Sequence, residues 1–305
     1  MAGALQDWRQ HKRPFAAIVS APIFWLVLFF LVPMGIVWLY SFGQNVGPAA
    51  IEITGTLDNY KRATAWLYLS TFLKRLAVAA LVTFICLIVG FPVAMAITFA
   101  TEKWRPWLLL AIMLPFWTNL LIRTYALMML MGQNGYANKG LGALWDGASW
   151  LRTLVGLQPL EAWTPVQLLY NNFAVVLGLV YVHLPFMVLP LYSALDRLDK
   201  SLIEASLDLG AGHFRTLMKI VVPLAGSGIA AGVMITLIPA LGAYLTPDLM
   251  GGTDSQMIAN VIERQFKRAN DWPFGAALSF LLIYAMFALV ALQSLRGSRA
   301  KVGAH

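Results

Sequence analysis

The sequence predicts an all-α integral membrane protein with six transmembrane helices. Of its 305 residues, 59% are hydrophobic and only 12% are charged, and the mean hydropathy is +0.70. A soluble domain carries about 25% charged residues, so an ordinary soluble core is excluded. Apolar runs of roughly 20 residues or more, long enough to cross a bilayer, recur along the chain. They lie at about 15–40, 72–100, 107–131, 169–191, 221–245 and 274–292.

These six runs define one predicted transmembrane domain at 15–293. A polar lead at 1–14, which contains Arg9 and Arg13, precedes the domain, and a basic tail at 294–305 follows it. The first run is longer than the apolar region of a cleaved signal peptide, so it is predicted to stay in the protein as a span.

The first two spans are separated by a segment of mixed polarity with turn residues, 43–65, which predicts a loop outside the membrane. The second span carries Arg75 near its entrance. A short turn that begins at Glu102 leads to the third span, which Pro115 interrupts. The long segment at 134–164, with several glycines and tryptophans, predicts a second external segment.

Three polar residues fall inside predicted spans: Asn119 and Arg123 in the third and His183 in the fourth. Ionisable groups are costly within a bilayer and are therefore candidates for a function. For Arg123 the favoured interpretation is structural, as a hydrogen-bond or ion-pair partner within the bundle. For His183 it is a hydrogen bond across helices from the neutral imidazole.

The distribution of basic residues predicts the orientation. Lysine and arginine are more frequent in four short segments, namely the lead, the turn after the second span, the fourth-to-fifth connection at 196–222 and the tail. They are fewer in the longer loops at 43–69, 132–168 and 246–272. Because basic segments stay in the cytoplasm, both termini and the 196–222 connection are predicted to lie there.

The most informative polar stretch is 201–223, SLIEASLDLGAGHFRTLMKIVVP. Ser201 and Glu204 have the spacing of a capping box, which predicts that a helix starts at Ser201. Leu202, Ala205 and Leu209 share one side of that helix, at i, i+3 and i+7.

The helix is predicted to end at Gly210, since a left-handed residue favours glycine there. A second helical segment is expected from 213 to 220. Pro223 is then predicted to open the fifth apolar run, where a missing amide does no harm.

Composition and motifs also exclude several classes of function. The net charge of +8 is spread over the ends of apolar runs rather than gathered on a soluble domain, which argues against nucleic acid. Cys86, the single cysteine, offers neither a disulfide nor a metal cluster. The glycine-rich segments at 135–142 and 226–232 lack the Lys-Ser/Thr ending of a phosphate loop. The chain is therefore predicted not to hydrolyse ATP and not to be an enzyme.

One enzymatic alternative is a membrane-embedded enzyme that acts on lipid. Asp196 and Asp199 form a D-x-x-D pattern of the kind that such chemistry uses. The flanking sequence offers no further acids at helical spacing for a metal ion, so these two aspartates are better interpreted as the start of the 201–223 stretch.

The 201–223 stretch resembles the EAA loop of permease subunits of bacterial ATP-binding-cassette (ABC) importers. That pattern is E-A-A, three residues, G, then about nine residues to I-x-x-P. The only departure is Ser206 for the second alanine. The matching residues are Glu204, Ala205, Ser206, Gly210, Ile220 and Pro223.

The resemblance narrows to spermidine/putrescine transport permeases of the B or H type. It is carried by LPFWTNLLIRTYA at 114–126, PFMVLPLYSALDRLDKSLIEASLDLGA at 185–211, PALGAYLTPDLMGG at 239–252 and NDWPFGAA at 270–277. The resemblance implies the six-helix fold of type I ABC importer permeases in the bacterial inner membrane. Within it, the EAA loop would dock into a groove on the ATPase and transmit its movement. Glu204 by itself would be better explained as a capping acid on a surface loop, but with Gly210, Ile220 and Pro223 in register the coupling role is favoured.

The resemblance also implies partners and cargo. They are a second permease in a heterodimer, two ATPase subunits that carry the ATP and Mg²⁺, and a periplasmic binding protein. No cofactor is expected on this chain. A polyamine cargo would favour carboxylates and aromatic faces, because ammonium groups bind over aromatic rings, and Arg123 would repel it. The candidates for the substrate path are Trp117, Tyr125, Tyr244, Asp248 and Glu263.

The cargo has an alternative within the same class of protein. An opine, an amino-acid derivative or an iron complex would be carried by a permease with the same loop and the same spans. The 201–223 stretch distinguishes none of these solutes from a polyamine.

Overall fold

The computed structural model describes residues 12–47 and 50–302. The predicted lead at 1–14 falls almost wholly outside the described residues, and so does the end of the tail at 294–305. The chain forms two compact units. One contains the chain up to Leu69 together with Ile262–Ala288, and the other contains Ser70–Val261 together with the chain from Leu289 onward.

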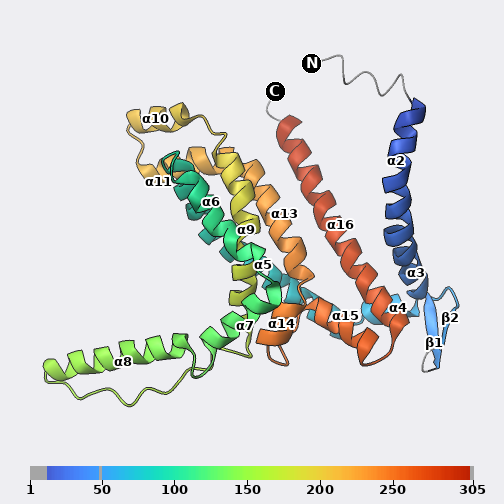
Figure 1. The fold of residues 1–305 in the computed structure, drawn as a ribbon, viewed down its shortest axis with the longest axis horizontal. Coiled ribbons are helices and arrows are strands. Elements are labelled where there is room, and N and C mark those ends of the chain that lie inside the picture. The colour runs from blue at the N-terminus through green and yellow to red at the C-terminus, as the bar shows by residue number, and fades with distance from the viewer. Residues whose placement is uncertain (1–11, 48–49, 303–305) are drawn as a thin grey trace. The chain divides into compact units, whose positions relative to one another are not determined.

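Helices make up nearly all of the regular structure (Figure 1). The elements up to the second span are α2 (Lys12–Leu26), a π-helical turn (Val27–Leu31), α3 (Val32–Tyr40), β1 (Gly43–Gly47), β2 (Ala50–Ile53), α4 (Asp58–Ala63) and α5 (Trp66–Phe99). The central elements are α6 (Arg105–Met113), a 3₁₀ turn (Leu114–Trp117), α7 (Leu120–Met131), α8 (Tyr136–Leu154), α9 (Asn172–Leu195) and α10 (Lys200–Asp208). The last elements are α11 (His213–Thr216), a second π-helical turn (Leu217–Val221), α12 (Val222–Leu224), α13 (Gly226–Leu241), α14 (Leu245–Met250), α15 (Ile258–Lys267) and α16 (Trp272–Val302).

The described residues contain four helices long and apolar enough to cross a membrane, at Ile18–Tyr40, Trp66–Phe99, Asn172–Leu195 and Trp272–Leu295. Two further pairs of helices pass the same test together, each bent at a short break, which brings the number to as many as six. Each of these six segments overlaps one of the six predicted spans, although the two bent pairs, Arg105–Leu154 and His213–Leu241, extend beyond the predicted bounds.

Both π-helical turns precede a proline by two residues, and the proline explains them. Proline has no amide to donate to the carbonyl four residues earlier, and its ring collides with that carbonyl. The turn before Pro33 is therefore widened, with the Val32 amide bonded to the Val27 carbonyl. The same widening precedes Pro223, where the Val222 amide bonds to the Leu217 carbonyl.

The first unit contains a β-hairpin that the sequence did not predict. Strands β1 and β2 pair antiparallel, with Gly43 opposite Ile53 and Gln44 opposite Glu52. The prediction for 43–65 was a loop, because strands of 5 and 4 residues are too short for a clear alternating pattern.

Polar contacts join this hairpin and α4 to the start of α16 within the first unit. The Asn45 side-chain amide donates to the Asn270 carbonyl at 2.8 Å. Arg62 pairs with Asp271 at 2.7 Å, and its guanidinium lies 3.9 Å from the centre of the Phe274 ring.

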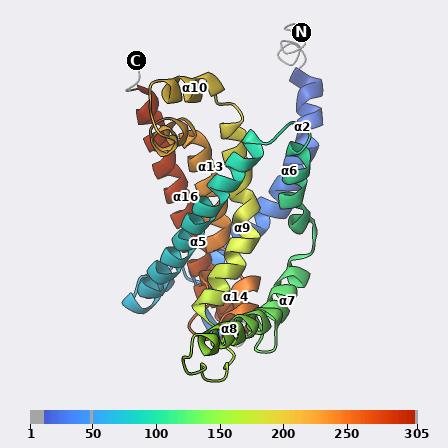
Figure 2. The same cartoon turned by 90° about the vertical axis from the view of Figure 1, so that its left-hand side faces the viewer.

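The second unit contains the apolar helices α5, α6, α9 and α13, of which α9 and α13 run side by side (Figures 1 and 2). Helices α9 and α13 contact each other along their lengths. Glycine permits this approach at Gly228, where an added Cβ would lie 2.8 Å from the Pro190 carbonyl oxygen. Buried residues of α5 follow helical spacing along one side: Ala79, Val82, Cys86, Gly90, Ala94 and Ile97.

The third span is broken where the sequence predicted an interruption. Helix α6 passes into the 3₁₀ turn that contains Pro115, Thr118 is extended, and Asn119 caps α7. The axes of Arg105–Trp117 and Leu120–Leu154 differ by 95°. The second of these segments ends in α8, a helix that the prediction of an external segment at 134–164 had missed.

The fifth span begins later than predicted. The chain from His213 to Leu224 and the chain from Gly226 to Leu241 are two helical segments that meet at 69°. Pro223 was predicted to open the fifth apolar run, but it lies at the end of the first segment. The widened π turn accommodates the proline, so the break falls two residues later, at Ala225.

Candidate functional site

The candidate site is α10 with the turn and helix that follow it. Helix α10 begins after Asp199, whose carboxylate accepts a hydrogen bond from the Ser201 amide at 3.0 Å. Hydrogen bonds from the Ser201 side chain and amide also hold the pKa of Asp199 below its ordinary value. The predicted capping box at Ser201 and Glu204 is therefore wrong: the cap is Asp199, whose carboxylate is a strong acceptor two residues earlier.

Gly210 ends α10 as predicted. Its φ of +80° is left-handed. The Gly210 amide donates to the Leu207 carbonyl at 2.9 Å, and the Ala211 amide donates to the Ser206 carbonyl at 3.1 Å. These two bonds form a Schellman motif, which satisfies the last carbonyls of a helix and reverses the chain.

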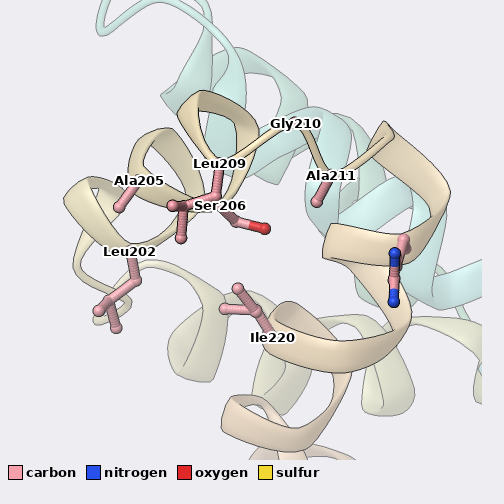
Figure 3. Close-up of a pocket in the computed structure, with 8 residues that line it drawn as sticks. Leu202, Ala205, Ser206, Leu209, Gly210, Ala211 and Ile220 are labelled. Carbon is pink, nitrogen blue, oxygen red and sulfur yellow. The ribbon is translucent and has the colours of Figure 1, made fainter.

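An open groove of about 420 Å³ lies between α10 and the helix after it (Figure 3). The side chains of Ser206, on α10, and Ile220, on the opposite wall, point toward this space (Figure 3). The groove is lined by Leu202, Ala205, Ser206, Leu209, Gly210, Ala211, Arg215 and Ile220. The predicted alignment of Leu202, Ala205 and Leu209 on one side of α10 is thus confirmed. We refer to this space as the α10 groove.

The α10 groove brings together four of the six residues of the EAA pattern: Ala205, Ser206, Gly210 and Ile220. Leu209, at the end of α10, is 88% exposed at the edge of this groove. Glu204 and Pro223 do not line the groove, although both are exposed to solvent.

Ser206 and Thr216 hold the two helices of the site together. Their hydroxyl oxygens lie 2.9 Å apart, and both residues are buried. Sequence reasoning treated Ser206 as a small residue in place of alanine and assigned no role to Thr216. The partnership depends on the turn at Gly210, so spacing alone gave no signal for it.

Two predicted residues of the substrate path lie together on one network. The Tyr244 hydroxyl donates to Asp248 at 3.4 Å. The Asn260 amide donates to the Tyr244 carbonyl at 3.1 Å and lies 3.4 Å from an Asp248 oxygen. Asn260 is only 1% exposed, and its side-chain oxygen accepts from the Met257 amide at 3.0 Å. Asn260 was not predicted, since a single asparagine in the first turn of an amphipathic helix gives no distinctive signal.

The other path candidates are placed separately. Trp117 and Tyr125 lie on either side of the break in the third span and are 72% and 51% exposed. Glu263 belongs to the first compact unit and forms an ion pair with Lys267 at 2.9 Å. Their predicted role in a substrate path remains a prediction.

The three intramembrane polar residues differ in their partners. Asn119 caps α7 by accepting from the Leu121 amide at 2.8 Å. The His183 Nδ1 lies 2.8 Å from the Leu179 carbonyl of its own helix, rather than bonding across helices as predicted. Arg123 is 9% exposed, and its Nε and Nη1 have no hydrogen-bond partner in the part of the chain that the structure describes. The bundle partner predicted for Arg123 is therefore not seen.

Within residues 12–47 and 50–302, no group of three or more His, Cys, Asp or Glu side chains is placed to hold a metal ion. The aspartates of the D-x-x-D pattern have other partners: Asp196 pairs with Arg105 at 3.0 Å, and Asp199 caps α10. The lipid-enzyme alternative therefore gains no support from this region.

Comparison with known proteins gives the family. No protein-family model matches the chain. The sequence is 40% identical over 275 residues to the spermidine/putrescine transport system permease protein PotB of Escherichia coli (strain K12), covering 90% of this chain and 94% of that protein. It is 37% identical over 277 residues to PotB of Haemophilus influenzae, covering 90% and 92%.

Solved structures give the fold. The structure of a bacterial ABC transporter that imports the acidic polysaccharide alginate aligns with a TM-score of 0.63, covering 96% of this chain and 98% of that one. The sequence identity is 13%, so this likeness concerns the fold alone. By its similarity to PotB along nearly the whole length of both chains, the protein belongs to the spermidine/putrescine transport system permease family and is a membrane permease subunit of an ABC transporter.

Proposed function

We propose that this chain forms part of the translocation path of an ATP-driven importer for a polyamine such as spermidine or putrescine. The observation that carries the proposal is the 40% identity over 92% of this chain and 93% of PotB of Salmonella typhimurium (strain LT2), because it extends over every span rather than the EAA loop alone. The exposed carboxylate of Asp248, held beside Tyr244, is chemistry suited to an ammonium group.

The α10 groove is the proposed contact with the ATPase. It lies on an exposed turn at one end of α9, while α14 lies at the other end (Figures 1 and 2). Its two walls are fastened to each other by the buried Ser206 and Thr216 pair. Because α10 and α11 form a rigid exposed element, a movement of the ATPase would be transmitted through them to α9 and α13, to which they are directly connected.

The proposed assembly contains a second permease, two ATPase subunits that bind ATP and Mg²⁺, and a periplasmic binding protein. In this arrangement both termini and α10 are cytoplasmic, and α14 faces the binding protein. The basic turn before α6 and the basic residues near α10 agree with this orientation.

Uptake by the reconstituted complex tests the cargo. The chain is assembled in vesicles with its partner permease, ATPase and binding protein, and ATP-dependent entry of radiolabelled putrescine and spermidine is measured. We expect saturable uptake of at least one polyamine and none without ATP. Uptake of molybdate or an amino acid in place of a polyamine would overturn the cargo proposal and leave the permease assignment intact.

A charge reversal on α10 tests the coupling role. We expect Glu204→Lys to abolish ATP-dependent uptake and to weaken ATPase attachment in a pull-down from detergent. Asp208→Lys makes the same charge change on the same exposed helix, at a position that the EAA pattern leaves unspecified, and serves as the matched control. Equal behaviour of the two variants would contradict a specific role for Glu204.

A further inference from the structure

Helix α8 (Tyr136–Leu154) has one face that the chain itself covers. The segment that returns from α8 to α9 lies along this face and bonds to it. Asn138 exchanges hydrogen bonds with the Val166 backbone at 2.9 and 3.0 Å, and the Ser149 hydroxyl accepts from the Leu160 amide at 3.0 Å. The covered positions repeat at helical spacing: Asn138, Gly142, Trp145 and Ser149.

The opposite face of α8 is apolar and uncovered. Leu144, Leu151 and Leu154 are 73%, 58% and 64% exposed, and Val155, directly after the helix, is 77% exposed. Alanine and glycine fill the positions between them. The charged residues lie at the edges of this face rather than within it: Lys139, Asp146 and Arg152. We refer to Leu144, Leu151, Leu154 and Val155 as the apolar face of α8.

The break in the third span sets the direction of α8. The segment that ends in α8 runs at 95° to Arg105–Trp117, which belongs to the membrane-crossing set of α5, α6, α9 and α13. Helix α8 projects to the side of the spans, at the end of the bundle opposite α10 (Figures 1 and 2). The returning segment lies on the side of α8 away from the spans (Figure 1). The apolar face is consequently turned back toward the level of the membrane.

We propose that α8 lies in the membrane interface, with its apolar face in the lipid and its covered face in water, on the side of the membrane opposite α10. An apolar stripe with charges at its edges, on a helix parallel to the bilayer, is the pattern of interfacial helices. Trp150, at the margin of the stripe and 62% exposed, is the residue type enriched at this depth. The helix would fix the depth and tilt of the broken third span. This proposal depends on the membrane location of the protein and not on its cargo.

The rates at which spin labels collide with oxygen and with a nickel chelate show whether the apolar face of α8 lies in lipid or in water. Cys86, the only cysteine in the sequence, is buried, so an introduced cysteine can be labelled selectively. Leu144→Cys and Leu151→Cys probe the apolar face, and Thr153→Cys on the exposed polar side is the matched control. The labelled complex is reconstituted with its partner subunits in vesicles of phosphatidylethanolamine and phosphatidylglycerol, and relaxation by oxygen and by a water-soluble nickel chelate is compared.

We expect oxygen to relax the labels at positions 144 and 151 more than the nickel chelate does, and the reverse at 153. Stronger relaxation by nickel at 144 and 151 would place the face in water and overturn the proposal. Protection from both reagents would show that a protein, such as the second permease, covers the face, and would also overturn it. Pull-down of the ATPase with each labelled complex shows separately that the variants are assembled, so a failed cargo proposal leaves this result unaffected.

Discussion

The hydroxyls of Ser206 and Thr216 share a buried hydrogen bond of 2.9 Å that joins α10 to α11 across the turn at Gly210. Ser206 is also the one position at which this chain departs from the E-A-A pattern. The Ser206 hydroxyl, which an alanine would lack, is paired with the Thr216 hydroxyl. It therefore strengthens the connection between α10 and α11 and is not left buried and unpaired.

Removing one of these two hydroxyls is expected to lower the free energy of unfolding more than removing both. In Ser206→Ala the Thr216 hydroxyl loses its partner while buried, which destabilises by about 1–3 kcal/mol. Thr216→Val should have a similar effect, and the double variant should recover most of the loss. Thermal unfolding of the purified chain in detergent, analysed as a double-mutant cycle, measures the coupling. Strictly additive effects would show that the bond contributes nothing.

Substitution of Gly210 is expected to destabilise the turn because of the backbone conformation of this residue, without any steric clash. Its φ is +80°, and an added Cβ would meet no atom within 4 Å. Gly210→Ala should therefore cost about 1–2 kcal/mol through the left-handed conformation and loosen the turn. Gly212, with φ of −69° and equally open space, is the matched control, and Gly212→Ala should change ATPase attachment little. A larger loss of attachment in the control would contradict this account of the turn.

The contact between α9 and α13 is expected to fail when Gly228 gains a methyl group. The added Cβ would lie 2.8 Å from the Pro190 carbonyl oxygen and would also collide with Ala194, so the two helices must separate. We expect a loss of about 1–3 kcal/mol, typical of overpacking. Gly226→Ala, at the start of the same helix and with open space around it, should leave the melting temperature nearly unchanged. Equal melting temperatures for both variants would show that the contact tolerates the methyl group.

Asn260 is expected to act on transport through Asp248 and Tyr244. Asn260→Asp keeps the acceptor for the Met257 amide but loses the donor to the Tyr244 carbonyl and adds a negative charge near Asp248. Repulsion between the two carboxylates should favour the protonated form of one of them and displace the Asp248 side chain. We expect a higher polyamine concentration at half-maximal uptake with ATPase attachment preserved. Unchanged uptake would remove Asp248 and Tyr244 from the substrate path.

Much of the fold could be predicted because its signals are local. Each span is a continuous apolar run, and the third span passes into a 3₁₀ turn at Pro115, shortly before its break at Thr118. The end of α10 at Gly210 was predictable for the same reason, since left-handed backbone favours glycine regardless of what surrounds it. The EAA pattern and the alignment of Leu202, Ala205 and Leu209 follow from spacing within two turns of one helix.

The features that were missed depend on residues that meet only after folding. Two candidate capping residues lie at the start of α10, and the structure selects Asp199 over Ser201 as its cap. The hairpin at Gly43 and the returning segment along α8 are held by bonds to distant parts of the chain, which periodicity does not record.

The sequence by itself determined the class of protein, its spans and the stretch that identifies its family. These features depend on local signals: the length of an apolar run and the backbone conformations that proline and glycine favour at their own positions. Only the tertiary structure decided which polar groups work together: Ser206 with Thr216 across a turn, and Asn260 with Tyr244 and Asp248 across two helices. Their hydrogen bonds need a spatial precision that no spacing along the chain specifies.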